Sequence, residues 1–248
     1  MNIPDPWVEE DRYYERLKKA ISLSLKVHGR EVPFLVEPPA EDFYYAVTPE
    51  EMEVVLNLLP PRHVVDLEYF VLRQQKAKEL LFESKWGCFR VFSTTGKYMG
   101  RSIHLCSQRK VDVIPWAKSL SKCNAEELKR LEGDGHRITS DARKYYIHTS
   151  LDSNRNTQLF RTLPHEVGHH VDAMEQYEWP GEDEHEAWEL LFDRYYSRPS
   201  REREDYAHRY ADEFFRRQVE LKNLPFPRIM NLERFEGFGI RPEWFQTS

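Results

Sequence analysis

We predict an α+β fold for this chain of 248 residues. Strand candidates, rich in β-branched and aromatic residues, are grouped between residues 63 and 107. Apolar residues at helical spacing dominate after residue 182. Hydrophobic residues make up 40% of the chain and aromatic residues 13%, which favours a folded globule over disorder. A chain of this length fits one domain, with or without an extension.

The N-terminal part reads as helical. Apolar residues recur at helical spacing between Trp7 and His28, and Gly29 offers a stop, so we expect an amphipathic helix there. Prolines at 33, 38 and 39 predict an irregular chain up to Thr48, which would cap a short helix ending near Leu59. We therefore assign residues 1–60 to an N-terminal helical extension packed on the core.

The strand candidates cover residues 63–72, 87–93 and 101–107. A turn composition at 94–97 separates the last two, which predicts an antiparallel hairpin. Signals weaken over 108–143, apart from a short helix ending at Gly133, and a segment of this kind often carries function or is mobile. We expect 144–149 to be a strand at the edge of a cleft.

The most informative stretch is Thr162 to Asp172, because it contains His-Glu-x-x-His. On a helix, His165 and His169 lie on one face about one turn apart, close enough to share a metal ion. Glu166 is one residue round from His165, so its carboxylate can reach a water on that metal without being a ligand. This pattern predicts a hydrolytic metal site.

Pro164 leaves two possibilities for the start of the motif helix. Either Thr162 caps a helix that begins at Leu163, or the helix begins near Asn156 and tolerates the proline at a cost of up to about 3 kcal/mol. We favour the earlier start with a local distortion.

Two more helices are expected after the motif, over 182–197 and 201–221, because apolar residues recur at helical spacing in both. Pro199 and Ser200 separate them. We assign residues 61–221 to the main domain. Residues 222–248 are aromatic but aperiodic, and we expect them to form a tail across the surface.

A catalytic zinc needs a third protein ligand that leaves one position open. His208 and Asp212 lie four residues apart on one face of the last helix, so His208 could bind the metal while Asp212 hydrogen-bonds a ligand histidine and fixes its orientation. The alternative ligand is Glu204, one turn before His208, with His208 then supporting the site from outside.

At these residues the chain resembles the zincin metallopeptidases, in particular the group whose later helix carries Glu-x-x-Ala-Asp. The resemblance implies zinc ligands at His165 and His169, a general base at Glu166 and a supporting role for Asp212. The chain departs from the group at His208, which stands where the family has its Glu. A zincin-like fold would place a small mixed sheet over the active-site helix, with further helices following.

We therefore expect a zinc-dependent endopeptidase with a polypeptide substrate, in which zinc lowers the pKa of its water toward ~7 and Glu166 takes the proton. One rival is a catalytically silent, zinc-stabilised regulatory or partner-binding module. Another is a zinc hydrolase of a small molecule. An open groove beside an exposed strand would favour peptide, and a closed pocket would not.

Charge and composition argue against other classes of partner. The net charge of −6 gives no general attraction to nucleic acid or to an anionic membrane. No signal peptide and no run of ~18 apolar residues is evident. Three cysteines without Cys-x-x-Cys spacing favour a reducing compartment, so we expect a cytoplasmic protein, although an effector exported without a cleaved signal would look the same. The sequence does not indicate an oligomeric state.

Overall fold

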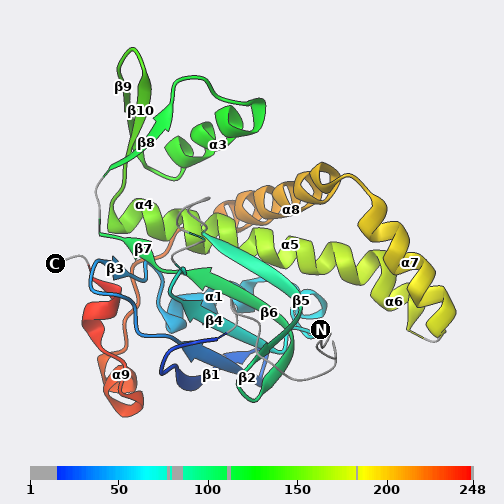
Figure 1. Ribbon diagram of the computed structural model, residues 1–248. Helices are drawn as coiled ribbons and strands as arrows, with labels where there is room; N and C mark the ends of the chain where they lie inside the picture. Colours follow the sequence, from blue (N-terminus) through cyan, green and yellow to red (C-terminus); the bar gives the residue numbers. More distant parts are fainter. Residues whose placement is uncertain (1–15, 77–78, 80–85, 111–112, 183, 247–248) are drawn as a thin grey trace, which may run out of the picture.

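The computed structural model describes residues 16–76, 79, 86–110, 113–182 and 184–246. It contains a five-stranded mixed sheet, a long helical segment that packs against it, and a small sheet with one helix that stands apart (Figure 1). The predicted α+β class is confirmed.

The large sheet has the order β1-β2-β4-β6-β5, so β5 is one of its edges. Neighbours β2 and β4, and β4 and β6, are parallel, whereas β1/β2 and β5/β6 are antiparallel. The predicted hairpin is confirmed as β5 and β6. The five strands are β1 (Ile21–Val27), β2 (Arg30–Val36), β4 (Tyr69–Arg73), β5 (Gly87–Thr95) and β6 (Tyr98–Cys106).

The helix predicted for residues 7–28 is wrong over 21–27, where the chain forms β1; residues 7–15 lie outside the described part. Leu23, Leu25 and Val27 alternate into the core, which is the period of a strand. His28 and Gly29 both have positive φ, the backbone that a two-residue hairpin turn needs. The described part of the assigned extension thus contributes two strands to the main sheet, and the boundary that we placed at residue 60 cuts through that sheet.

Helix α1 (Pro49–Leu58) is confirmed, with its predicted cap. The Thr48 side chain accepts from the Glu51 backbone, and the Glu51 side chain accepts from the Thr48 backbone. A 3-10 turn, η1 (Pro61–His63), follows. A two-stranded ribbon pairs β3 (Phe43–Tyr44) with β7 (Gln108–Arg109).

A single helical segment runs from 151 to 181 and carries the motif. Its start confirms the earlier of our two alternatives, and the distortion is a π-helical segment directly before Pro164. Proline has no N–H and its ring clashes with the carbonyl four residues back, and the wider π turn relieves both. Its parts are α4 (Leu151–Arg155), η2 (Asn156–Thr162), α5 (Leu163–Ala173), η3 (Met174–Glu178) and α6 (Trp179–Gly181).

The two later helices are confirmed as α7 (His185–Ser197) and α8 (Ser200–Glu220), and α8 lies along α5. The C-terminal residues do not form the surface tail that we expected. They fold as α9 (Leu232–Phe238) and η4 (Pro242–Phe245), and Phe235 and Phe245 are fully buried in the main core. Within the described residues, none of the helices has the length and apolar character needed to cross a membrane.

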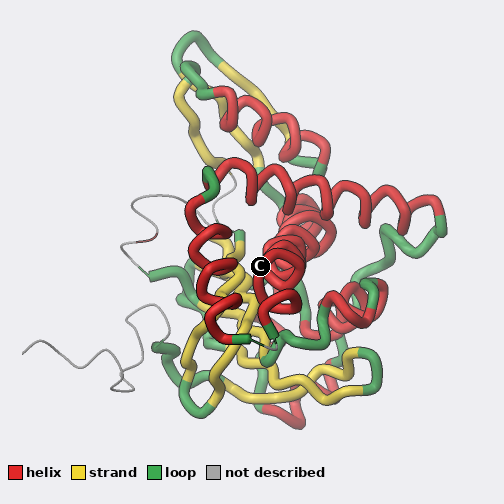
Figure 2. The backbone as a smooth tube through the Cα atoms, turned by 90° about the vertical axis from the view of Figure 1, so that its right-hand side faces the viewer, coloured by secondary structure: helices red, strands yellow, loops and turns green. Residues whose placement is uncertain are grey.

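Residues 113–148 form a small unit above the motif helix, which we call the 113–148 subdomain (Figures 1 and 2). Its sheet has the order β8-β10-β9. The strand predicted at 144–149 is confirmed as β10, but it is paired on both sides and so offers no free edge to the cleft. Its elements are β8 (Val113–Ala117), α3 (Lys122–Gly133), β9 (Arg137–Ser140) and β10 (Lys144–His148).

Candidate metal centre

The two motif histidines face one another on consecutive turns of α5. The Nε2 atoms of His165 and His169 are 3.1 Å apart. Glu204 approaches both from α8, with one carboxylate oxygen 3.3 Å from Nε2 of His165 and the other 3.5 Å from Nε2 of His169. Three donor groups from two helices therefore converge on one point.

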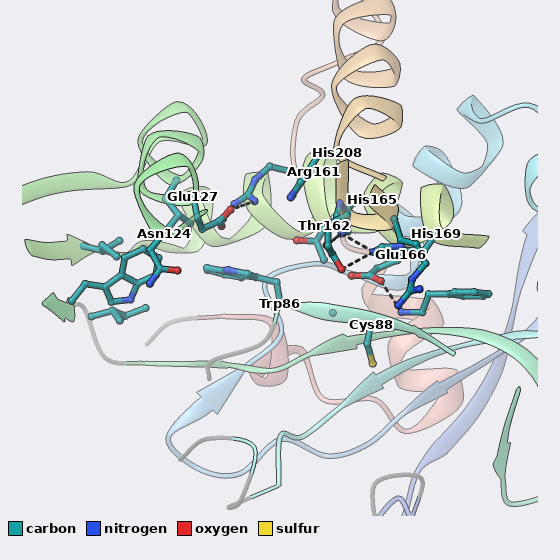
Figure 3. A pocket seen from close by; sticks show the side chains of 18 of the residues that line it. Trp86, Cys88, Asn124, Glu127, Arg161, Thr162, His165, Glu166, His169 and His208 are labelled. Atoms are coloured by element: carbon teal, nitrogen blue, oxygen red, sulfur yellow. Dashed lines mark hydrogen bonds and ion pairs between the residues drawn. The ribbon is translucent and has the colours of Figure 1, made fainter. Parts of the chain in front are cut away.

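His208 lies next to this group. Its ring centroid is 4.4 Å from that of His165. Ligand atoms of His165, Glu204 and His208 all lie within 4.8 Å of one another. Of the two third ligands that the sequence left open, Glu204 is therefore the one that contacts both motif histidines. His208 lies beside His165 (Figure 3).

Contacts and burial within the cluster shift the pKa values of three of its side chains. Hydrogen bonds from His165 and His169 hold the pKa of the Glu204 carboxyl well below its usual range, so this group is a carboxylate at neutral pH. Burial lowers the pKa of His208 to about 4, and the neighbouring His165 adds to the effect, so His208 is a neutral imidazole. Burial alone would lower the pKa of His169, but its contact with Glu204 and the nearby Glu166 raise it.

The residues present fit a zinc ion. Imidazole nitrogens and a carboxylate oxygen are the donor set of catalytic zinc sites, and neutral imidazole is the form that coordinates. The two Nε2 atoms, 3.1 Å apart, and the two Glu204 oxygens, 3.3 Å and 3.5 Å from them, surround one point. The donor set thus has the composition and the convergence that a metal site requires.

Glu166 is buried beside this cluster. Its Oε2 accepts a hydrogen bond of 2.7 Å from the backbone N–H of Phe89 on β5. Phe89 lies opposite Ile103 of β6, and because β5 is an edge strand, the backbone groups that do not bond to β6 point outward; the Phe89 N–H is one of these and points toward α5. The edge strand therefore fixes the orientation of the Glu166 carboxylate. This contact joins residues 77 positions apart, and no local pattern predicts it.

Asp212 does not take the place that we predicted. Its side chain is exposed and lines a separate cavity of about 320 Å³, together with Phe160 and Phe215. Nδ1 of His165 is buried and has no hydrogen-bond partner among the described residues, so Asp212 does not orient that ring. Asp212 follows His208 by one turn, but it does not line the cleft that holds His208.

Close packing of α5 on α8 brings Glu204 to the histidines. Gly168 sits against Ala207: a Cβ added to Gly168 would lie 3.0 Å from Cα of Ala207. Farther along, Asp172 is fully buried and pairs with Arg198 at 2.6 Å. His170 packs on the ring of Phe89, on the side of α5 away from the cluster.

The cluster opens into a cleft of about 960 Å³. One wall is the edge strand β5, and the opposite wall consists of β8 and α3 of the 113–148 subdomain (Figure 3). The strand beside the cluster is thus β5 and not the predicted 144–149.

Comparisons with models of protein families, with curated proteins and with solved structures found no match to this chain. The position of Glu204 nevertheless had a signal in the sequence. Residues Glu204 to Ala207 read Glu-x-x-Ala, the first part of the zincin pattern described above, and His208 then occupies the place of its Asp. Anchoring that pattern on Ala207 instead of Ala211 moves the ligand position by one turn, to the residue that contacts both histidines.

Proposed function

We propose that the protein is a zinc-dependent endopeptidase of zincin-like fold, in which His165, His169 and Glu204 hold the metal and Glu166 is the general base. The observation that carries this proposal is the convergence of Glu204 on both motif histidines, 3.3 Å and 3.5 Å away, at the floor of a large cleft. His208 is proposed to support His165 from outside the metal's ligand sphere.

When bound, a zinc ion supplies Lewis acidity, which lowers the pKa of water and polarises a carbonyl. Glu166 would take a proton from the attacking water and deliver it to the leaving amine. A buried carboxylate suits this task because Phe89 fixes one of its oxygens and its surroundings keep bulk water away. Four neighbouring groups therefore have distinct roles, three as ligands and one as the base.

A polypeptide fits the cleft better than a small molecule does. β5 is an edge strand of the large sheet and lines the cleft beside Glu166, and an extended chain can add to such an edge as a further strand next to Phe89, whose own N–H is already bonded to Glu166. A pocket for a small substrate is usually closed around its ligand, whereas about 960 Å³ of open cleft extends from the cluster to the 113–148 subdomain. A silent metal module is disfavoured because a purely structural site gains nothing from the buried acid at position 166.

We further propose a cytoplasmic location, which rests only on the cysteine pattern of the sequence. We propose no nucleic-acid or membrane partner.

The test is the Glu166→Gln variant, compared with Glu175→Gln as a matched control. Glu175 lies farther along the same helical segment, is exposed and contacts Tyr206 away from the cleft. Both variants should bind zinc like the parent protein, but only Glu166→Gln should lose hydrolysis of a denatured protein substrate. Undiminished cleavage by Glu166→Gln would eliminate the mechanism.

A further inference from the structure

The 113–148 subdomain has an apolar side that the main core does not cover. None of the hydrophobic core clusters of the described residues includes a residue from 113–148. Its apolar side chains instead line the cleft, together with Trp86, the residue before β5. We call this group the apolar subsite: Trp86, Ile114, Trp116, Leu120, Leu131 and Ile147.

The apolar subsite is held in place by polar contacts at its base. Arg161 donates to Glu127 at 3.1 Å, as Figure 3 shows, and to Asp134 at 2.7 Å, and these bonds connect α3 to the helical segment that carries the metal cluster. Thr157 adds a hydrogen bond of 2.8 Å to Asp134. These contacts fix the subsite relative to the cluster before any ligand arrives, so binding need not order it.

The charges at the apolar subsite are already paired with one another. Arg161 is shared by Glu127 and Asp134, and Glu127 also accepts from Arg130 at 2.9 Å. A charged ligand group entering here would lose water and find its potential partners occupied. An apolar side chain loses nothing of that kind, and it covers the half-buried side chains of the subsite, behind which Leu131 and Ile147 are already buried.

The apolar subsite and the metal cluster belong to one continuous cavity, since both line the same cleft (Figure 3). An extended chain added to β5 with its scissile bond near Glu166 would therefore present a neighbouring side chain to the apolar subsite. We propose that this subsite selects polypeptides with a large apolar residue at one fixed position relative to the cleaved bond. The proposal rests on the proposed endopeptidase function.

The experiment compares cleavage of a proteome-derived peptide pool by the zinc-loaded parent protein and by the variants Trp116→Ala and Trp179→Ala, read by mass spectrometry. Trp179 is the matched control, because it is half-buried like Trp116 but does not line the cleft. The parent and Trp179→Ala should prefer Phe, Leu, Met or Trp over Ala or Gly at one position by about tenfold to a hundredfold. Trp116→Ala should reduce that ratio by about tenfold.

A second variant separates lost selectivity from lost folding. Trp116→Glu places an unpaired carboxylate in the subsite, and it should bring a new preference for Lys or Arg at the same position, which a misfolded protein cannot acquire. An unchanged preference profile in both Trp116 variants, with cleavage intact, would overturn the subsite while leaving the endopeptidase function standing.

Absence of any cleavage by the parent protein would instead refute the endopeptidase function. In that case, binding decides the question of the subsite. Immobilised Glu166→Gln protein should enrich peptides with large apolar residues from the same pool, and the added Trp116→Ala change should abolish the enrichment. Equal capture by both proteins would overturn the subsite independently of activity.

Discussion

Replacing Gly168 by Ala should destabilise the protein because the new methyl group would meet backbone. A Cβ at this position would lie 3.0 Å from Cα of Ala207, 3.1 Å from Cβ of Tyr210 and 3.2 Å from the Ala207 carbonyl oxygen. Atoms of the backbone cannot turn aside like the end of a flexible side chain. Helices α5 and α8 would therefore have to separate by a few tenths of an ångström.

The magnitude follows from two opposing effects. Overpacking of this kind costs about 1–3 kcal/mol, whereas Ala favours a helix over Gly by about 1 kcal/mol. Gly237 on α9 is the matched control, since a Cβ there meets nothing within 4 Å. Gly237→Ala should gain only the higher helix propensity of Ala. The free energies of unfolding of the two variants should therefore differ by the cost of overpacking, about 1–3 kcal/mol.

Urea denaturation of the metal-free proteins measures that difference, and a zinc titration measures its consequence for the site. Ligand distances in metal sites tolerate shifts of about 0.2 Å, so separating Glu204 from the α5 histidines should weaken zinc binding by roughly tenfold. Equal stability of the two variants, with zinc affinity unchanged in Gly168→Ala, would refute the idea that this contact sets the geometry of the site.

Two further predictions concern buried charges. Arg198→Ala should lower the free energy of unfolding, measured in urea, by about 3 kcal/mol or more, because it leaves the fully buried Asp172 carboxylate without its charged partner. Adding Asp172→Asn should recover part of this loss. No recovery would contradict the idea that the unpaired carboxylate causes it. Burial lowers the pKa of His136 to about 4, below its unfolded value of ~6.5, so its neutral form stabilises the fold above pH ~6.5, and this contribution is lost as the pH falls through about 4. As the pH falls from about 6.5 to about 4, the free energy of unfolding of a His136→Gln variant should therefore decrease by up to about 3 kcal/mol less than that of the parent, measured by urea denaturation at each pH. Equal decreases in both proteins would show that His136 does not cause the pH dependence.

Local signals in the sequence predicted much of the fold. The capping pair Thr48 and Glu51, the turn between β5 and β6, and the apolar stripe of α8 each involve residues close in sequence, so the pattern alone is sufficient. Pro164 likewise predicted a distortion of the helix, and the π-helical segment confirms it.

Features that depend on distant partners were missed. Residues 21–27 satisfy helical spacing at Ile21 and Leu25 and also alternate as a strand, and only pairing with β2 decides between the two. We assigned the edge of the cleft to 144–149 because the sequence patterns of β8 and β9 were too weak to predict strands. These two strands pair with β10 on either side.

The candidate site also has a part that local spacing predicts and a part that depends on distant residues. His165, Glu166 and His169 follow from spacing within one helix. Choosing between Glu204 and His208 requires the crossing of α5 and α8, because both residues lie on the same face of α8 and only the position of α5 distinguishes them.

The most direct test of the metal centre is the zinc dissociation constant, measured by competition with a chelator, for the parent protein, Glu204→Gln and His208→Gln. Loss of a ligand should weaken binding by more than about a hundredfold in Glu204→Gln, whereas loss of a supporting contact should cost His208→Gln no more than about tenfold to a hundredfold. The opposite order, or zinc affinity that neither change affects, would contradict the proposed site.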